Sequence, residues 1–244
     1  MAGVVVLAAL VAAIIGVLGA AYAYWRWVWF WRNPPRQPPD GDDILSAADG
    51  VVVYAKKVAP GEPVVSIKQG NALRIEDLVH EHAQETKLVI GVFMSPFDVH
   101  YNRAPVGGVV DFIRHYPGRG KNLDMGAMHR RILMKRPPYY EASPHIAHNE
   151  RTVTKIDGHW NGAALSCYIV QIAARTVAGI DSYFEPGRRV ERGATFGMIR
   201  IGSQVDIVLP WSDAMAVRVA EGDRVRAGET VLVGRALPPS AAAS

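Results

Sequence analysis

The sequence holds one cysteine in 244 residues, so no disulfide can form within the chain. Cys167 lies in the apolar run AALSCYIVQIAA, which indicates a buried thiol and a soluble part that fits a reducing compartment. The sequence has neither a C-x-x-C pair nor a G-x-S-x-G motif, so thiolate zinc sites and serine-hydrolase elbows lack support. The net charge is +4, but Lys and Arg are scattered. This pattern argues against nucleic acid as a partner and fits anionic lipid headgroups.

Charge is also absent from residues 4–24, VVVLAALVAAIIGVLGAAYAY. As an α-helix, these residues span roughly 30 Å, the thickness of a bilayer's hydrocarbon core. The following WRWVWFWRNPPR supplies interfacial aromatic residues and then arginines. We therefore expect a transmembrane anchor with its interfacial belt at 1–32, and the rest of the chain on the cytoplasmic side of the cell membrane.

The alternative is a secretory signal peptide cut after Ala21-Tyr22-Ala23. The preceding MAG carries no basic residue and the apolar run is long for such a peptide, so the anchor is favoured. The Pro-rich stretch 33–43, NPPRQPPDGDD, is predicted to be a stiff linker. Residues 44–244 then form one domain.

Short β-branched runs bounded by Gly, Pro and Asp fill this domain and predict a mainly β fold, a barrel-like sandwich of strands and hairpins. Helix or irregular cover is predicted at 75–85 and 172–180. The runs are GVVVYAKKV, KLVIGVFM, VGGVVDFI, RTVTKID, CYIVQIA, FGMIRI, QVDIVLP and ETVLVG.

A weak repeat, G-x-x-V-x-x-G, occurs within 185–197 and again within 220–232. Its glycines predict turns that set up β-hairpins, similar to those of lipoyl and biotinyl carrier barrels. This raises an alternative function, a non-catalytic membrane-tethered carrier or adaptor module. A carrier needs a lysine at a hairpin tip, and WSDAMAVRVA between the repeats has none.

Polar residues gather in two places that could hold a site. Asp49 in SAADGVVV either opens a strand as a turn residue or has a chemical role. In FMSPFDVHYNRAP, an extended backbone would place Asp98, His100 and Asn102 on one face, next to Arg103. His100 is the best acid or base among them, because a histidine pKa allows proton transfer near neutrality.

The other histidines carry less weight. His80 and His82 have a spacing that places them on different faces of a helix. His145 and His148 lack further metal ligands, and His159 in DGHWNG is predicted in a turn. We therefore expect no metal site.

Gly202-Ser203, within FGMIRIGSQVDIVLP, has two interpretations. One is an ordinary dipeptide, with a hydroxyl on a strand and a glycine at a bulge. The other is a self-cleaved bond, which requires a hydroxyl to attack the preceding carbonyl, a glycine that permits a strained backbone and a nearby base.

Taken in order, AADG, FMSPFDVHYNRAP, HNERT, IVQIAART and FGMIRIGSQVDIVLP resemble a phosphatidylserine decarboxylase proenzyme of the short, membrane-anchored prokaryotic branch. The resemblance covers most of residues 28–210. It implies that the precursor cuts itself through an ester and a β-elimination. The β chain would end at Gly202, and the α chain, 203–244, would begin with a pyruvoyl group made from Ser203.

The resemblance further implies the reaction. The substrate's amine forms a Schiff base with the pyruvoyl carbonyl, which serves as the electron sink while CO₂ leaves and phosphatidylethanolamine is formed in phospholipid biosynthesis. His100 is the expected acid, and Asp49 matches an aspartate implicated in activating the serine. Asp98, Asn102 and Arg103 are candidates for supporting the site.

Two departures from longer family members are clear. Ile201 and Gln204 replace the usual Leu and Thr around Gly-Ser, and Arg103 occupies the position of a second His, where an arginine cannot serve as a base. His100 then serves both steps, or Asp49 acts with another group. Residues 121–148 match poorly and are predicted to form a surface lid whose basic residues meet lipid phosphate.

The substrate is then a membrane phospholipid, either diacyl phosphatidylserine or its ether-linked archaeal counterpart, archaetidylserine. The family implies a homodimer. A family member that has lost self-processing and survives as a scaffold is the third alternative.

Overall fold

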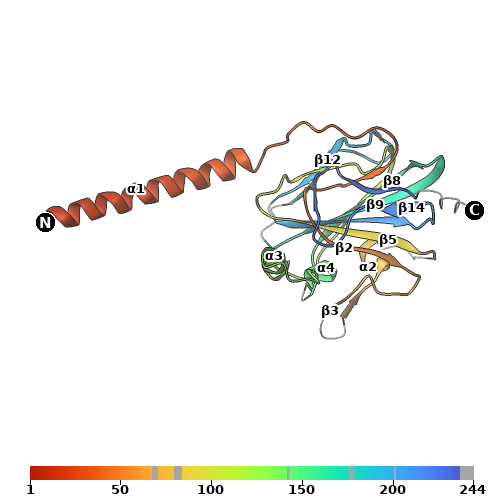
Figure 1. Ribbon diagram of the computed structural model, residues 1–244, viewed down its shortest axis with the longest axis horizontal. Coiled ribbons are helices and arrows are strands. Elements are labelled where there is room, and N and C mark those ends of the chain that lie inside the picture. Colours follow the sequence, from red (N-terminus) through yellow and green to blue (C-terminus); the bar gives the residue numbers. More distant parts are fainter. Residues whose placement is uncertain (68–70, 80–83, 142, 176–178, 201, 237–244) are drawn as a thin grey trace, which may run out of the picture. The chain divides into compact units, whose positions relative to one another are not determined.

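The computed structural model describes residues 1–67, 71–79, 84–141, 143–175, 179–200 and 202–236. The chain divides into two compact units, Met1–Pro34 and Pro35–Ser244. In the first, helix α1 (Ala2–Tyr24) runs directly into a turn of π-helix, Trp25–Trp29 (Figure 1). Over these 28 residues the helix is long and apolar enough to cross a membrane, and an 18-residue window within it has a mean hydropathy of 2.9.

Aromatic and basic side chains meet where this helix ends. The Arg26 guanidinium lies 5.0 Å from the Trp27 ring centroid, and that of Arg32 lies 4.3 Å from Trp29. Such pairs give arginine an apolar partner, and Trp is enriched at membrane–water interfaces. The sequence of this unit therefore fits an anchor with an interfacial belt.

The second unit is built on an eight-stranded sheet in which every pairing between the described strands is antiparallel. The long central strands are rich in Val and Ile, which suit a sheet buried on both faces. In spatial order the strands are β11 (Arg189–Val190), β7 (Gly108–Tyr116), β8 (Arg151–Trp160), β9 (Ala163–Ala173), β13 (Ser203–Pro210), β5 (Lys87–Met94), β2 (Gly50–Val58) and β15 (Arg224–Val225).

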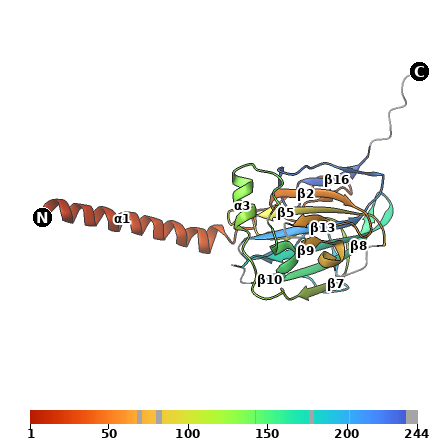
Figure 2. The ribbon, with the colours of Figure 1, turned by 90° about the horizontal axis from the view of Figure 1, so that it is seen from below.

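Two three-stranded sheets pack against one face of the large sheet, and three short helices cover the other (Figures 1 and 2). The helices are α2 (Ile75–Val79), α3 (Gly126–Leu133) and α4 (His145–His148). The small sheets are β1 (Ile44–Leu45), β16 (Val231–Arg235) and β14 (Met215–Val217), and β10 (Ile180–Ser182), β12 (Thr195–Ile199) and β6 (Tyr101–Arg103); β3 (Val65–Ile67) pairs with β4 (Asn71–Leu73).

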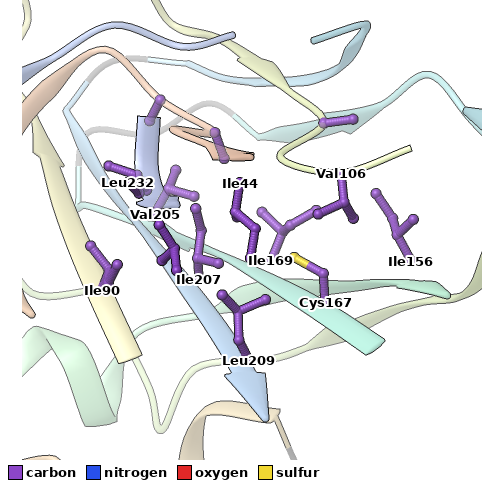
Figure 3. Close-up of a cluster of buried hydrophobic side chains, with 14 of the residues drawn as sticks. Ile44, Ile90, Val106, Ile156, Cys167, Ile169, Val205, Ile207, Leu209 and Leu232 are labelled. Atoms are coloured by element: carbon purple, nitrogen blue, oxygen red, sulfur yellow. The ribbon is translucent and has the colours of Figure 1, made fainter. Parts of the chain in front are cut away.

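Each face of the large sheet has its own core. On the face under the small sheets, side chains from β13 and β9 meet Ile44 and Leu232 (Figure 3). Cys167 is fully buried among them, and burial raises the pKa of its thiol, so the prediction of a buried structural cysteine is confirmed. On the other face, Met128 of α3 and Ile146 of α4 are completely buried against the sheet.

The G-x-x-V-x-x-G repeats close the two edges of the large sheet. The valine of the first repeat lies in β11, which pairs with β7, and that of the second lies in β15, which pairs with β2. The second glycines of the two repeats, Gly193 and Gly228, are in contact. The repeat thus forms two matching edge strands rather than hairpins, because each repeat's short strand pairs across to the large sheet.

The mainly β fold with an apolar amino-terminal helix is confirmed, and each of the eight predicted runs contributes a strand. The predicted cover at 172–180 is wrong at its start, because β9 continues through Ala173 between two neighbours. His159 lies in β8 rather than in a turn. The predicted helix at 75–85 is described only as Ile75–Val79, and His80 and His82 lie outside the described residues.

The Pro-rich stretch contacts the β domain directly from residue 36 onward. Arg36 reaches Asp49 and Glu229, and Arg192 donates to the carbonyl of Pro39. The N–H of Asn161 donates to Asp42 at 2.6 Å. These contacts fix the path of residues 36–43 over the domain surface.

Candidate active site

Gly202 and Ser203 lie where the chain turns into β13. Gly202 has φ +63°, in the left-handed region that glycine adopts without the penalty of a Cβ atom. Just upstream, Arg200 is held by two hydrogen bonds to Asp181, at 2.9 and 2.8 Å. The Gly202–Ser203 peptide is therefore fixed between an anchored arginine and a central strand.

Ser203 begins β13 between two other strands. It pairs with Met94 of β5 on one side and with Ala173 of β9 on the other. Its side chain is fully buried, and its Oγ donates to Met94 Sδ at 3.3 Å. Sulfur is a weak acceptor, so this contact restrains the hydroxyl only lightly. Ser203 is thus shielded from solvent and held by one weak hydrogen bond.

His100 contacts the amide N–H of Gly202, one peptide unit before the Gly202–Ser203 bond. The N–H of Gly202 donates to His100 Nε2 at 3.3 Å, which makes Nε2 an acceptor. In a neutral imidazole, Nδ1 then carries the proton and donates to the carbonyl of Asp98 at 3.0 Å. His100 is completely buried. Its basic nitrogen therefore faces the residue before Ser203, where a general base for the hydroxyl would have to lie.

Asp98 shapes the turn that brings His100 to this position. Its carboxylate accepts from both the N–H and the Oγ of Ser95, at 2.8 and 2.7 Å, and pairs with Arg224 at 2.8 Å. The turn breaks the extended backbone that would have placed Asp98 on a face with His100. His100 and Asn102 do share a buried face, while Tyr101 between them is partly exposed.

Asn102 and Arg103 hold β6 in place. Asn102 is fully buried, accepts from Gln171 Nε2 at 2.8 Å and donates to the carbonyl of Ala47 at 3.4 Å. Arg103 donates to the carbonyl of Gly193 at 3.0 Å, and its side chain also approaches Gly228. Burial lowers the pKa of the Arg103 guanidinium. Arg103, at the position where longer family members have a second histidine, thus lies beside the second glycines of the two G-x-x-V-x-x-G repeats.

Asp49 lies at the start of β2, two strands away from Ser203. Its carboxylate pairs with Arg36 at 2.8 Å and accepts from the N–H of Ala227 at 2.8 Å. Burial raises the pKa of this carboxyl despite those two contacts. Within the described part of the chain, Asp49 therefore contacts neither Ser203 nor His100.

A second polar cluster lies behind Ser203, on the opposite face of the sheet. The Gln204 amide donates to Asp206 at 2.7 Å and to Tyr54 Oη at 2.8 Å, and Tyr54 Oη donates to Asp206 at 2.7 Å. His145 Nε2 lies 3.4 Å from Gln204 Oε1. Since Gln204 directly follows Ser203, this cluster fixes the residue next to Ser203.

Burial changes the ionisation of this cluster. It raises the pKa of Asp206 to about 6, although hydrogen bonds from Gln204 and Tyr54 oppose the shift. Burial also lowers the pKa of His145 to about 4. Gly91 leaves room for the cluster, because a Cβ atom there would lie 2.6 Å from the Tyr54 ring and 2.9 Å from Asp206.

Asn149 ties the segment before α3 to the Ser203 end of the sheet. Its Nδ2 donates to the carbonyls of Leu123 and Ala173 at 2.8 and 2.7 Å, and its Oδ1 accepts from the N–H of Leu123 at 2.8 Å. Ala173 is the strand partner of Ser203. The motif HNERT therefore contributes an asparagine that braces the site.

The remaining histidines serve packing and loops. His145 belongs to the cluster behind Ser203, and His148 contacts the carbonyl of Lys121 at 3.2 Å. In the described ranges, no group of three or more His, Cys, Asp or Glu side chains is arranged to hold a metal ion.

The sequence does not by itself reveal Met94 or the cluster behind Ser203. The partners Tyr54, Gln204 and His145 come from three distant segments, which only the fold brings together. A signal did exist: Asp206 interrupts the apolar run QVDIVLP, and a buried carboxyl needs partners.

The sequence matches the phosphatidylserine decarboxylase family over residues 24–233. It is 35% identical to a phosphatidylserine decarboxylase proenzyme from Thermobifida fusca over 204 residues, 84% of this chain and 71% of that one. A Polynucleobacter asymbioticus protein of the same name is 32% identical over 235 residues, 90% and 89% of the two chains. A Methanocaldococcus jannaschii protein named as an archaetidylserine decarboxylase proenzyme is 34% identical over 206 residues, 84% and 87%.

A buried serine after a left-handed glycine, with a histidine hydrogen-bonded to the N–H of that glycine, fits the class of self-processing proenzymes. The match over most of the chain is more specific. The protein belongs to the phosphatidylserine decarboxylase family.

Proposed function

We propose that the chain is the precursor of a pyruvoyl-dependent decarboxylase that converts phosphatidylserine into phosphatidylethanolamine and CO₂ in phospholipid biosynthesis. The observation that supports this most directly is the hydrogen bond from the N–H of Gly202 to His100 Nε2. Self-cleavage requires a base, a hydroxyl and a glycine that permits an unusual backbone, and His100, Ser203 and the left-handed Gly202 are residues of these types.

In the proposed cleavage, His100 Nε2 takes the proton of Ser203 as Oγ attacks the carbonyl carbon of Gly202. The C–N bond breaks, the nitrogen of residue 203 accepts a proton, and Gly202 is left esterified to Oγ. β-Elimination then removes the Cα proton of residue 203 and releases the Gly202 carboxylate. The dehydroalanine left at residue 203 tautomerises to an imine, which water hydrolyses to the pyruvoyl carbonyl with release of ammonia. The products are the β chain, residues 1–202, and the α chain, residues 203–244.

The uncleaved chain already fixes the position of residue 203, where the pyruvoyl carbonyl would form. The backbone there is paired with β5 and β9, and Gln204 is held by Asp206, Tyr54 and His145. When present, the pyruvoyl group supplies the electron sink for decarboxylation. Because β13 is an inner strand of the sheet, the α chain remains held by the β chain after cleavage.

His100 is also the proposed proton donor for decarboxylation, since it lies next to residue 203 on the same face as the Ser203 side chain. Asp98 orients His100 through its backbone carbonyl, while Asn102 and Arg103 hold the strand that follows. Asp49 is the second residue that we propose to take part in activating Ser203. Its pairing with Arg36 would have to open before it reached the serine or His100.

The proposed substrate is a membrane lipid with a phosphoserine headgroup, reached by a chain anchored through α1 with its β domain on the cytoplasmic side. An ether-linked lipid is the second candidate, favoured by the 34% identity to the Methanocaldococcus jannaschii protein. Both substrates share the headgroup on which the chemistry takes place. We also propose that the enzyme is a homodimer, as the family resemblance implies.

The test uses the purified full chain in vesicles that contain diacyl phosphatidylserine labelled at the serine carboxyl carbon, with ether-linked archaetidylserine in a parallel sample. The proposal predicts release of labelled CO₂ and formation of the corresponding ethanolamine lipid. A Ser203→Ala chain prepared in the same way is the control. Absence of CO₂ from both lipids with a fully cleaved chain would contradict the proposed activity.

A further inference from the structure

The end of α3 carries apolar side chains that the domain does not bury. Leu133 and Met134 are 72% and 55% exposed, and Leu133 is the most exposed large apolar side chain among the described residues of the β domain. They lie outside the buried stripe of this segment, which Met125 and Met128 supply. Packing within the domain therefore gives no reason for their apolar character.

Basic residues surround this apolar pair. Arg130, Lys135 and Arg136 are exposed, and within the described ranges none of them has a carboxylate partner. The neighbouring carboxylate of Glu141 is already paired with Arg131, at 2.5 Å. We call residues 130–136 the α3 tip. It combines exposed apolar groups with three uncompensated positive charges.

The α3 tip is presented on a rigid support. Met128 is completely buried, and the His129 ring lies 5.5 Å from that of Phe93 in β5. The chain then turns at Lys135, whose φ is +51°, with its N–H bonded to the carbonyl of Ile132. Leu133 and Met134 are thus held outward at the start of a fixed turn.

The support also places α3 near the Ser203 end of the sheet. Asn149 joins Leu123, just before α3, to Ala173, which pairs with Ser203. Phe93, under His129, is paired with Gln204. The tip and the scissile bond therefore belong to the same end of the domain.

We propose that the α3 tip is a membrane contact separate from α1, in which Leu133 and Met134 enter the acyl region of an anionic bilayer while Arg130, Lys135 and Arg136 lie against lipid phosphates. Apolar side chains flanked by unpaired cations complement such a surface in both charge and polarity. The contact would hold the Ser203 end of the domain against the membrane that contains the substrate. In this respect the inference rests on the proposed function.

The test is made on the full chain in vesicles, with a cysteine at position 133 (Leu133→Cys) carrying an environment-sensitive fluorophore. Cys167 is fully buried, so it stays unlabelled in the folded protein. Ala163→Cys, at the exposed first residue of β9, is the matched control. Lipids with a nitroxide in the acyl chain quench only fluorophores that enter the bilayer.

In vesicles that contain phosphatidylglycerol, the label at 133 should be quenched at least threefold more than the label at 163. Replacing Arg130, Lys135 and Arg136 together by Gln should reduce that difference by half or more. Gln at the exposed Arg114, Arg188 and Arg189 removes the same charge elsewhere and should leave it unchanged. Pure phosphatidylcholine vesicles should resemble the triple variant of the tip.

Equal quenching at 133 and 163 would overturn the proposal. So would a label at 133 that is shielded from water but not quenched by the nitroxide lipids, because a second protein surface would then cover the tip. The readout is independent of turnover. Quenching at 133 without decarboxylation would contradict the proposed function alone, and decarboxylation without quenching would contradict the membrane contact alone.

Discussion

The backbone N–H of Gly202 donates to Nε2 of His100, and this hydrogen bond joins residues 102 positions apart, one peptide unit before the bond that the family resemblance marks for cleavage. It sets the tautomer of His100, with the proton on Nδ1 and the basic nitrogen facing Gly202. Ser203 Oγ donates to Met94 Sδ at 3.3 Å. For the proposed cleavage, this hydroxyl must leave Met94 and hydrogen-bond to His100 Nε2.

Replacing His100 tests whether it is the general base for self-cleavage. Gln places an amide oxygen near the position of Nε2 and accepts the Gly202 hydrogen bond, but it cannot take a proton at neutral pH. We expect His100→Gln to slow self-cleavage by about 100-fold or more, in keeping with the loss of a general base. The fraction of cleaved chain is followed over time by denaturing gel electrophoresis. A folded His100→Gln chain that cleaves at the wild-type rate would remove His100 from this step.

Variants of Asp49 and Arg36 test whether Asp49 takes part in the cleavage reaction or only stabilises the structure of the site. If Asp49 helps to activate Ser203, Asp49→Asn should slow cleavage by about 100-fold, while Arg36→Gln, which releases the carboxylates of both Asp49 and Glu229, should slow it less than about fivefold. Both variants break the same 2.8 Å ion pair. The cleavage rates of the two variants are measured at pH 8 and compared. Equal slowing in the two variants would mean that Asp49 acts only through the ion pair.

Met94 accepts the hydrogen bond of the Ser203 hydroxyl, which the proposed attack on Gly202 has to break. Met94→Leu keeps the apolar volume and removes the sulfur acceptor, so we expect self-cleavage to accelerate by about two- to fivefold, the effect of losing one weak hydrogen bond. Met215→Leu, in the same core, is the matched control and should have no effect on the rate. Slower cleavage in Met94→Leu alone would mean that the sulfur contact orients the hydroxyl for attack.

The cluster behind Ser203 predicts two opposing pH effects on stability. The pKa of Asp206 is raised to about 6, so its contribution is fully present below its unfolded pKa of about 3.8 and is lost as the pH rises through 6. The pKa of His145 is lowered to about 4, so its contribution is present above about 6.5 and is lost as the pH falls through 4. Between pH 4 and 6 the two slopes have opposite signs.

Single substitutions should reveal how the ionisation of each group changes stability with pH. Relative to wild type, Asp206→Asn should gain in stability as the pH rises from 4 to 6, because the slope of His145 is no longer opposed. His145→Gln should lose stability over the same range, because only the slope of Asp206 remains. Thermal unfolding of the full chain in detergent, at pH 4, 5 and 6, measures the differences. Parallel pH profiles for both variants and wild type would contradict the assigned ionisation.

The strands were predictable because each is a short β-branched run between turn residues, and GVVVYAKKV and KLVIGVFM correspond to β2 and β5 at both ends. The partners of the repeats were not predictable. A two-residue strand such as Arg189–Val190 carries no local preference for β7 over its own neighbour in the chain. Its pairing depends on which sheet edge the rest of the fold leaves open.

The site was predictable only in part. Gly202, Ser203 and His100 come from recognisable motifs, and the fold brings them together. Asp98 does not lie on the predicted face, because its carboxylate accepts a hydrogen bond within its own turn and the backbone there is not extended. The rule that side chains alternate along a strand does not include such local hydrogen bonds. The role of Asn149 depends on contacts with Leu123 and Ala173 that sequence spacing does not reveal.

The central claim is that the chain cuts itself between Gly202 and Ser203, and the intact mass of the purified protein under denaturing conditions tests it most directly. We predict two fragments for wild type, residues 1–202 and residues 203–244 with the mass of an amino-terminal pyruvoyl group, and one uncut chain for Ser203→Ala. A wild-type preparation that remains a single chain of 26.6 kDa would contradict the account.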